Sequence, residues 1–328
     1  MNTALMNALP LFPALAEEPG EFNEFAHELA ASLRAHPRQV SPKFFYDAAG
    51  SALFDQICEL PEYYPTRTEL GILHEHAADM AARIGPHAEI VEYGAGSSRK
   101  VRVLLDALEQ PQRFVPVDIS GEHLHASTAT LRAAYPALEV RPVVADFTRP
   151  VALPSRLPGH GLRVGFFPGS SIGNFDPLEA RRFLRQLAGQ LRGGGLLIGT
   201  DLIKDPAILH AAYNDAAGVT AAFNRNLLVR ANRELGADFR INDFAHYAFY
   251  NAQQQRIEMH LISRCGQQVS IGDESFDFSE GDSIHTENSY KFTVEGFHAL
   301  AIEAGFRPAA TWCDARRWFC LHWLEAPA

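Results

Sequence analysis

The sequence predicts an α/β fold, with an open, mostly parallel sheet between helices and a second, α+β lobe beside it. Strand-like and helix-like segments alternate from residue 89 to residue 201, which is the pattern of βαβ units. Runs such as residues 164–167 are apolar throughout, which is expected of strands covered on both faces. The strand-like segment 89–93 has an apolar run that ends in an acidic residue, and a glycine turn and a helix follow, as after a buried parallel strand.

The composition is typical of a soluble globular protein, and the charge argues against two classes of partner. The chain has 328 residues, of which 47% are hydrophobic and 21% charged, enough for one large domain or two modest ones. Its formal net charge is -10, so it lacks an overall electrostatic attraction for nucleic acid or anionic membrane. We expect neither as a partner; a local basic groove would be the exception for nucleic acid.

The cysteines and the N-terminal segment predict a cytoplasmic protein. Cys58, Cys265, Cys313 and Cys320 form no Cys-x-x-Cys pair, so we expect neither a zinc site nor a disulfide framework. Residues 1–16 lack a basic leader and contain two prolines, which makes a poor signal peptide. No apolar run is long enough to span a bilayer.

The elements follow from local patterns in chain order. Residues 22–36 have apolar side chains at helical spacing, and the aromatic-rich loop 61–67 precedes a helix that runs to about residue 84. The expected strands of the parallel sheet are 89–93, 114–117, 140–145, 162–167 and 196–202. The expected helices between them are 99–108, 122–135 and 177–191.

The alternation breaks after residue 202. Residues 205–234 predict one or two helices, 246–250 and 256–263 a hairpin, and 267–271 and 276–278 further strands. A helix at 294–304 and strands at 309–312 and 318–323 close the chain. We therefore expect one domain of residues 68–201 plus 291–328 and a second of residues 1–67 plus 202–290.

The turn Glu92-x-Gly94-x-Gly96 resembles the first motif of the class I S-adenosylmethionine (SAM) methyltransferases, which have a Rossmann-like sheet. Arg99 stands where a dinucleotide-binding fingerprint has its third glycine. Gly94 and Gly96 would let the methionine part of SAM lie against the backbone. The resemblance thus implies SAM as the cofactor.

Further residues at successive strand ends fit the same cofactor. Ser97 belongs to the glycine turn, and Lys100 could reach the carboxylate of SAM. Asp118 lies 24 positions after the first glycine, about where an acid binds a ribose diol. Asp146 could accept from the adenine amino group while Phe147 packs on the ring. Alone, Asp118 is equally explained as a helix cap and Lys100 as a solvated charge; their shared place at strand ends favours SAM.

Four longer segments resemble a more specific family. They are residues 60–67, the run Gly169-Ser170-Ser171-Ile172-Gly173-Asn174, residues 217–224, and Thr286-Glu287. Together they resemble the histidine-specific SAM-dependent methyltransferases, which trimethylate the α-amino group of L-histidine to hercynine, the first step of ergothioneine biosynthesis. The resemblance extends from about residue 40 to residue 325.

The resemblance implies roles for five residues around the amino acid backbone of the substrate. Asn174 and Tyr213 would hold its carboxylate, since an amide N–H and a phenol O–H both donate to an anion. The backbone of Gly169 and the hydroxyl of Tyr46, through water, would surround the α-amine, and Tyr63 would line the pocket. Without the resemblance, Asn174 is an ordinary turn residue and Tyr63 a core aromatic.

The resemblance also implies how the imidazole is recognised. Glu287 would accept from the ring N–H, Ser289 would donate to the other ring nitrogen, and Met259 would form an apolar wall. An apolar ring would leave Glu287 unpaired, and a site of this kind rejects such analogues by ~10⁴ or more. Glu287 is thus the expected specificity residue, although alone it would be an ordinary solvated acid.

The chemistry predicted for the site needs no metal. His246, His260 and His285 have no ligand spacing with a carboxylate, so we expect them to be structural. A free α-amine is mostly protonated at pH 7, and the positive sulfonium nearby should favour loss of that proton. No Asp or Glu is placed as a strong base, so we expect Tyr46 with water to orient the amine and relay the proton.

Three alternatives stay open. A related enzyme could methylate another amino acid, such as tryptophan or tyrosine, although Glu287 with Ser289 argues against it. A catalytically silent SAM-binding module should have lost its acceptor residues. Nucleic-acid methylation is disfavoured by the acidic charge and by the lack of an Asn-Pro-Pro-Tyr-type motif. We expect a monomer.

Overall fold

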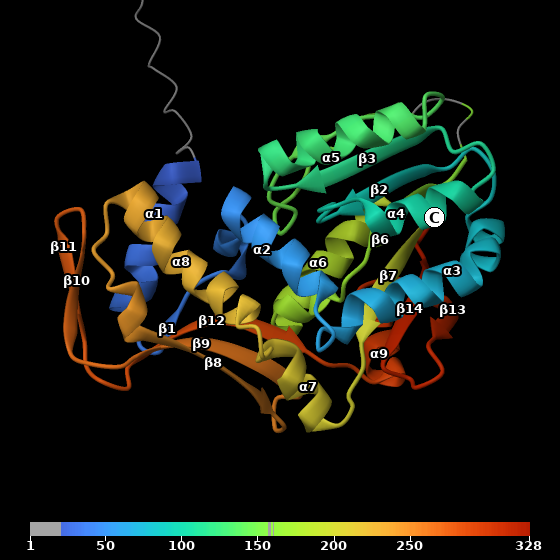
Figure 1. The fold of residues 1–328 in the computed structure, drawn as a ribbon. Coiled ribbons are helices and arrows are strands. Elements are labelled where there is room, and N and C mark those ends of the chain that lie inside the picture. The colour runs from blue at the N-terminus through green and yellow to red at the C-terminus, as the bar shows by residue number, and fades with distance from the viewer. Residues whose placement is uncertain (1–20, 157–158, 160) are drawn as a thin grey trace, which may run out of the picture.

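The computed structural model describes residues 21–156, 159 and 161–328, with side chains from residue 24 onward, and is drawn in Figure 1. The expectation for residues 1–16 and the side chain of Phe22 lie outside the described residues. Two lobes stand side by side in this view.

The larger lobe is built on an eight-stranded sheet with the order β13-β14-β7-β6-β2-β3-β4, and β5 pairs with β3 beside β4. Its strands are β2 (Glu89–Tyr93), β3 (Arg113–Asp118), β4 (Glu139–Val140), β5 (Val143–Val144), β6 (Arg163–Phe167), β7 (Gly195–Asp201), β13 (Arg307–Cys313) and β14 (Phe319–Glu325). The pairs from β4 to β7 are parallel, and β14 runs antiparallel to both of its neighbours. This sheet confirms the expected class I methyltransferase fold.

The strand expected at residues 140–145 is instead two short strands, and that expectation was wrong. Both β4 and β5 pair with β3, but the ladder is interrupted between them. Pro142 lies in the interruption, and proline has no N–H to donate to a ladder.

Helices cover both faces of this sheet. They are α3 (Tyr64–Ile84), α4 (Arg99–Ala107), α5 (Gly121–Ala134), α6 (Pro177–Gln190) and α9 (Val294–Glu303). On β2, Ile90 packs into the core beneath α3 and α4, whereas Val91 packs into the core beneath α6 and α9. Asp176 and Glu179 form a capping box that begins α6 with Pro177 in its first turn.

The second lobe is a four-stranded sheet, a hairpin and helices around one core (Figure 1). The sheet has the order β1-β12-β9-β8, with β1 (Arg38–Gln39), β8 (Phe244–Asn251), β9 (Arg256–Ser263) and β12 (Ser283–Tyr290). The hairpin is β10 (Gln267–Ile271) with β11 (Glu274–Phe278). The helices are α1 (Glu21–Arg34), η1 (Pro42–Phe45), α2 (Ala48–Glu59), α7 (Pro206–Tyr213), α8 (Val219–Leu235) and η3 (Ile241–Asp243).

The cores draw on different parts of the chain. The second lobe's core takes its residues from 25–64 and 209–284, whereas the two cores of the larger lobe lie within 72–198 and 297–324. The division into residues 68–201 plus 291–328 and residues 1–67 plus 202–290 stays our proposal.

The lobes meet where η2 (Ser171–Asn174) packs on β12. Asn174 Nδ2 donates to the carbonyl of Asn288 at 2.7 Å. A Cβ on Gly173 would lie 2.7 Å from the carbonyl oxygen of Tyr290, so the close approach of the two backbones requires glycine at this position.

The expectation for the cysteines was wrong for one pair. Cys313 and Cys320 face each other in the β13–β14 ladder and form a disulfide. A spacing of seven residues does not by itself predict a disulfide. The two cysteines meet because they are paired in the register of β13 and β14. Within the described part of the chain, Cys58 and Cys265 are free, and no helix is long and apolar enough to cross a membrane.

His322 on β14 is buried in a polar cluster and makes a testable contribution to stability. Its Nε2 lies 2.8 Å from Thr200 Oγ1 and its Nδ1 lies 3.1 Å from His298 Nε2. Burial, with a smaller contribution from His298, lowers the pKa of His322 from 6.5 to about 3. The unfolded chain therefore binds this proton between those two pH values while the folded chain does not, so stability falls as the pH falls.

We expect His322→Gln to reduce this acid sensitivity. The slope of the free energy of unfolding against pH between pH 6 and pH 4 should fall by up to about 1.4 kcal/mol per pH unit. Urea denaturation at several pH values measures it, with His125→Gln, an exposed imidazole outside this cluster, as the control. An unchanged slope in His322→Gln would contradict the assignment.

Candidate active site

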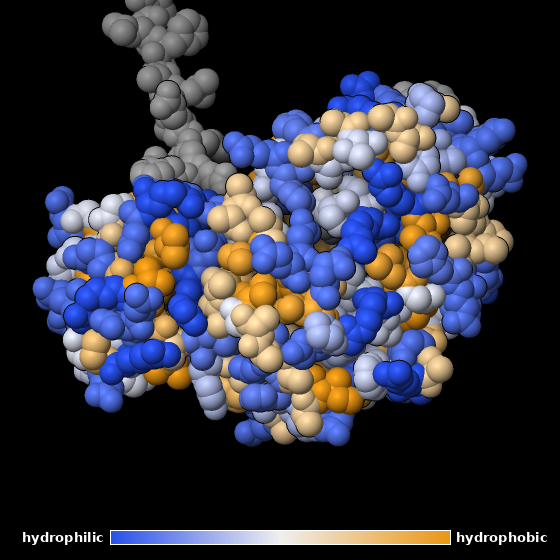
Figure 2. All heavy atoms as spheres, viewed as in Figure 1, coloured by the Kyte–Doolittle hydropathy of each residue, from blue (hydrophilic) through white to orange (hydrophobic). Residues whose placement is uncertain are grey.

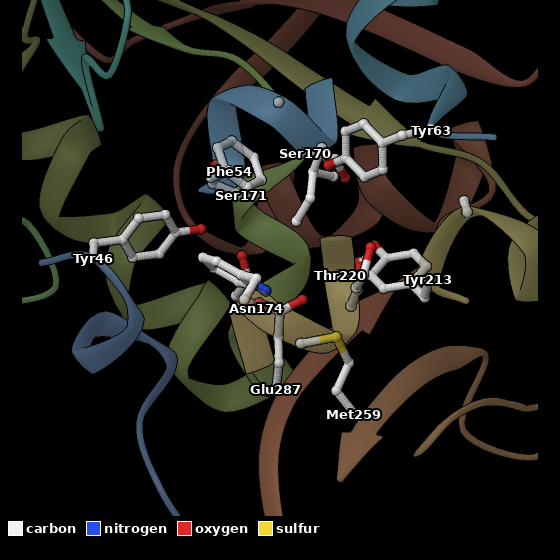
Figure 3. Close-up of a pocket in the computed structure, with 15 residues that line it drawn as sticks. Tyr46, Phe54, Tyr63, Ser170, Ser171, Asn174, Tyr213, Thr220, Met259 and Glu287 are labelled. Atoms are coloured by element: carbon white, nitrogen blue, oxygen red, sulfur yellow. Dashed lines mark hydrogen bonds between the residues drawn. The ribbon is translucent and has the colours of Figure 1, made fainter. Parts of the chain in front are cut away.

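A pocket lies between the lobes and is lined by residues from both (Figure 3). Its space amounts to about 520 Å³, including its open mouth. All eight residues expected around the substrate line this pocket: Tyr46, Tyr63, Gly169, Asn174, Tyr213, Met259, Glu287 and Ser289. These residues come from segments far apart in the sequence, and the fold places them around one pocket. From the sequence, only the family resemblance had grouped them. Their individual roles stay predictions.

Other lining residues were missed from the sequence. They are Phe54, Ile57, Ser170, Ser171, Ala212, Thr220 and Phe223. Ser170, Ser171, Thr220 and Phe223 belong to the segments that carried the resemblance, so that signal could have found them. Phe54 and Ile57 lie on α2. Figure 2 shows hydrophobic residues gathered near the middle of the drawn face, around that helix.

Glu287 projects into the pocket from β12 (Figure 3). The register of β12 shifts between His285 and Glu287, and beyond that shift Glu287 and Ser289 alternate onto the pocket face. Burial raises the pKa of Glu287 from 4.5 to about 7, while the charge of Lys291 and the amide of Asn174 oppose the shift. The carboxyl is therefore poised to pair with a donor from a ligand.

Ser289 and Tyr213 are tied to a buried ion pair behind the pocket wall. Tyr213 Oη donates to Ser289 Oγ at 2.7 Å. Lys291 Nζ donates to Ser289 Oγ at 2.8 Å and lies 2.8 Å from Asp201 Oδ2. Lys291 and Asp201 were not predicted as site residues, because each of them taken alone is indistinguishable from an ordinary surface charge.

The aromatic side of the pocket consists of neutral phenols. Burial, with a smaller contribution from the Glu287 charge, raises the pKa of Tyr46 well above 10. The Tyr46 ring meets Phe54 and Phe223 edge-on, with centroids 5.8 and 5.7 Å apart. Tyr63 meets Tyr213 in the same way at 6.5 Å. A phenol that keeps its proton can orient a ligand but is a poor base.

The glycine turn after β2 has the shape expected of a cofactor site. Gly94 and Gly96 have φ of 72° and 40°, a backbone that favours glycine. Asp118 at the end of β3 accepts from Gly96 N at 3.3 Å. A Cβ on Gly94 would lie 3.4 Å from the ring of Phe147, so that ring closes over the turn. Glu92 Oε2 is buried beneath it with no hydrogen-bond partner among the described residues.

These features fit SAM. The unpartnered oxygen of Glu92 leaves a buried acceptor for a polar ligand, and the carboxylate of Asp118 stands at the turn where a ribose would lie. Glu92 Oε2 lacks a partner among the described residues, whereas Asp118 already accepts from the backbone amides of Gly96 and Ser120. The glycine turn and the two carboxyl groups beside it are therefore compatible with bound SAM, without a role being assigned to each residue.

Lys100 and Asp146, two further expected cofactor residues, have protein partners. Lys100 Nζ lies 2.7 Å from Glu69 Oε2, and Glu69 also accepts from Gly169 N at 2.8 Å, so Lys100 links the glycine turn to the substrate pocket. Asp146 accepts from Thr148 N at 2.9 Å. Ser97 is exposed on the turn.

One group of described side chains could approach a metal ion, and it lies outside the pocket. Glu258, His260 and His285 place their donor atoms within 4.8 Å of one another. The two imidazoles stack with centroids 4.6 Å apart, and Arg256 Nε donates to Glu258 at 2.8 Å. Stacked rings do not aim their nitrogens at one point, and a guanidinium repels a cation. His246 bonds Asn224 and the Tyr213 carbonyl.

Comparison with known proteins gives concordant matches. A family model described as histidine-specific, SAM-dependent methyltransferase matches residues 25–326. A histidine N-alpha-methyltransferase of Mycolicibacterium smegmatis is 45% identical over 293 residues, 88% of this chain and 90% of that protein. One of Mycobacterium tuberculosis is 41% identical over 306 residues, 92% of this chain and 94% of that protein. Ergothioneine biosynthesis protein 1 of Neurospora crassa is 30% identical over 297 residues, 84% of this chain and 32% of that protein.

Proposed function

The chain belongs to the histidine-specific, SAM-dependent methyltransferase family, and from that premise we propose that it trimethylates the α-amino group of L-histidine to hercynine, the first step of ergothioneine biosynthesis. The protein is a SAM-dependent methyltransferase. The observation that carries the choice of substrate is the pair Glu287 and Ser289, side by side on one face of β12 in the interlobe pocket.

The cofactor, when bound, supplies a methyl group on a sulfonium. The residues of this chain that would hold it are the glycine turn at Gly94, the Asp118 carboxylate and the Phe147 ring. Glu69 connects the two sites: its carboxylate pairs with Lys100, which follows the glycine turn, and accepts from Gly169 N, which lies in the pocket that contains Glu287. Donor and acceptor would therefore approach each other near Gly169.

Recognition of the imidazole follows from its two different nitrogens. A neutral imidazole has one N–H and one acceptor nitrogen. The Glu287 carboxylate would take the N–H, and the Ser289 hydroxyl would donate to the other nitrogen. Met259, which faces Glu287 across the β9–β12 ladder, would cover the apolar ring.

The α-carboxylate would be held by Asn174, whereas the hydroxyl of Tyr213, also expected there, is bonded to Ser289. Asn174 donates one amide hydrogen to the Asn288 carbonyl, and its amide also bonds Glu287, so the ligand carboxylate would compete with Glu287 for the second hydrogen. The Tyr213 proton points to Ser289 in this structure, so we expect it to share in binding by keeping that hydroxyl in place.

The α-amine would lie between Gly169 and Tyr46. The amide N–H of Gly169 donates to Glu69, which leaves its carbonyl oxygen as the group that can accept from the amine. Tyr46 keeps its proton at neutral pH because burial raises its pKa. We propose that it orders a water against the amine and passes the released proton to solvent.

Tyr46→Phe tests this role. We expect kcat to fall about 10-fold with the affinity for SAM unchanged, because one orienting hydrogen bond is lost and no base is removed. Steady-state kinetics with histidine measure the effect, and Tyr247→Phe, an exposed phenol on the outer face of β8, is the control. An unchanged kcat would remove Tyr46 from the mechanism, and a loss of about 10³-fold or more would make it a general base.

A catalytically silent SAM-binding module remains the rival from another class. Calorimetric titration of histidine into protein saturated with S-adenosylhomocysteine separates the two. We expect saturable binding of histidine that is lost in the Glu287→Ala variant. Absence of binding would favour the silent module.

The assembly and cellular location of the protein are also proposals. We propose a cytoplasmic monomer whose pocket is complete within one chain, since both walls come from the same chain. Sedimentation equilibrium tests the monomer. A stable dimer would contradict it.

A further inference from the structure

We propose that Lys291 is a positioning residue for substrate specificity: it fixes the direction of the hydrogen bonds at Tyr213 and Ser289, so that Ser289 can only donate to the ligand. This inference rests on the proposed function. Lys291 follows β12 directly and is 3% exposed, although it lies next to the two residues expected to contact histidine.

The contacts of Lys291 account for all three of its donors. Its Nζ lies 2.8 Å from Ser289 Oγ, 3.2 Å from Tyr213 Oη and 2.8 Å from Asp201 Oδ2. The ammonium also lies 5.0 Å from the centroid of the Tyr213 ring. Burial disfavours the charge, but Asp201 outweighs burial, and the pKa of Lys291 is raised. The cation is thus permanent and fully bonded.

An ammonium can only donate, and this property sets the polarity of its neighbours. Ser289 Oγ accepts from Lys291 and also from Tyr213, at 2.8 and 2.7 Å. A hydroxyl oxygen has two acceptor positions, and both are now filled. The remaining group on Ser289 is its own proton, and Ser289 lines the pocket. The pocket therefore presents a donor at Ser289 beside an acceptor at Glu287.

That arrangement selects one form of the ring. A neutral imidazole with its N–H at Glu287 and its free nitrogen at Ser289 satisfies both residues. An imidazolium, or a ring with N–H groups only, would bring a donor against the Ser289 proton. Without Lys291, Ser289 would regain an acceptor position and tolerate either kind of ring nitrogen.

Lys204 provides a matched control inside the same cluster. It is also buried and also pairs with Asp201, and its Nζ donates to Tyr64 Oη at 2.8 Å. Burial lowers the pKa of Lys204 to about 8, so it is mostly charged at pH 7. Its ammonium bonds Tyr64, Asp201 and the carbonyl of Leu202 rather than Tyr213 or Ser289, so its loss removes a similar buried charge without touching the hydroxyl pair.

The experiment compares Lys291→Met with Lys204→Met. We expect Lys291→Met to raise the KM for histidine about 30-fold with a smaller change in kcat, and Lys204→Met to stay within about 3-fold. Lys291→Arg, which keeps a cation that only donates, should recover most of the loss. Affinity for S-adenosylhomocysteine, measured by calorimetry, should be unchanged in every variant.

A double-mutant cycle tests whether Lys291 acts through Ser289. In a Ser289→Ala background, Lys291→Met should add less than about 3-fold to the KM, since the hydroxyl that it orients is absent. If Lys291→Met does not bind S-adenosylhomocysteine, the same cycle is run with Lys291→Gln, whose amide can accept as well as donate.

Three results would overturn the proposal: equal effects of the Lys204 and Lys291 variants, full additivity with Ser289→Ala, or an unchanged KM in Lys291→Met. The wild-type protein is assayed in parallel. Failure of the wild type to methylate histidine counts against the proposed function, whereas normal wild-type activity with any of these three results counts against Lys291 alone.

Discussion

Glu287→Ala is expected to lower kcat/KM for histidine about 100-fold and to admit larger aromatic amino acids as substrates. The carboxyl is the acceptor that the pocket offers to the ring N–H, and burial holds its pKa at about 7. Removal of the side chain leaves the imidazole N–H unpaired in a dry site, which costs the full desolvation of that group. It also frees space between Asn174 and Met259 for a larger ring.

Glu287→Gln is the matched control for this prediction. It keeps the size of the side chain and one acceptor oxygen but removes the charge, so we expect a loss of about 10-fold and no gain of larger substrates. Initial rates with histidine, tryptophan and tyrosine measure both variants. Undiminished histidine turnover in Glu287→Ala would remove Glu287 from substrate recognition.

Asp118→Ala is expected to raise the dissociation constant for SAM about 100-fold, because two hydrogen bonds to a charged acceptor are lost. Asp118 is well placed for such a role, since its carboxylate accepts from Gly96 N at 3.3 Å and from Ser120 N at 2.9 Å and is thereby fixed at the turn. Asp118 does not line the substrate pocket.

Calorimetry with S-adenosylhomocysteine measures the Asp118 effect directly. Asp118→Asn keeps an acceptor oxygen for the backbone amides and separates loss of the turn from loss of the charge. We expect it to weaken binding about 10-fold. An unchanged dissociation constant in Asp118→Ala would place the ribose elsewhere.

Much of the larger lobe could be predicted because the sequence patterns that indicate its strands and helices each lie within a short stretch of the chain. Strand β2 begins and ends at the expected residues, since a short, mainly apolar run that stops at a glycine turn is typical of a buried strand. The boundaries of α4, α5 and α6 also differ by one residue at most from those expected. The break between β4 and β5 was missed because a single proline, Pro142, overrides an otherwise apolar run.

Strand β12 was missed for the opposite reason. Its sequence Ser-Ile-His-Thr-Glu-Asn-Ser-Tyr is too polar to predict a strand, although Thr286, Asn288 and Ser289 are buried. Glu287 and Ser289 face the pocket and Thr286 bonds Asn224, and these surroundings cannot be read from the sequence. The strand that carries the predicted specificity residues is thus the one that propensity fails to find.

The candidate site divides in the same way. The eight expected lining residues were found through the family resemblance, and Tyr63, Gly169, Asn174 and Glu287 lie in the segments that carry it. Lys291 and Asp201 could not be found, because their pairing at 2.8 Å joins two positions 90 residues apart. A buried charge is recognisable only when its partner is known.

The most direct test of the account is one incubation with SAM and an equimolar mixture of the free amino acids, analysed by tandem mass spectrometry. The account predicts that histidine alone gains methyl groups, up to three, and that all of them lie on the α-nitrogen with the ring unmodified. Methylation of tryptophan or tyrosine in preference to histidine, or of the imidazole nitrogens, would contradict it.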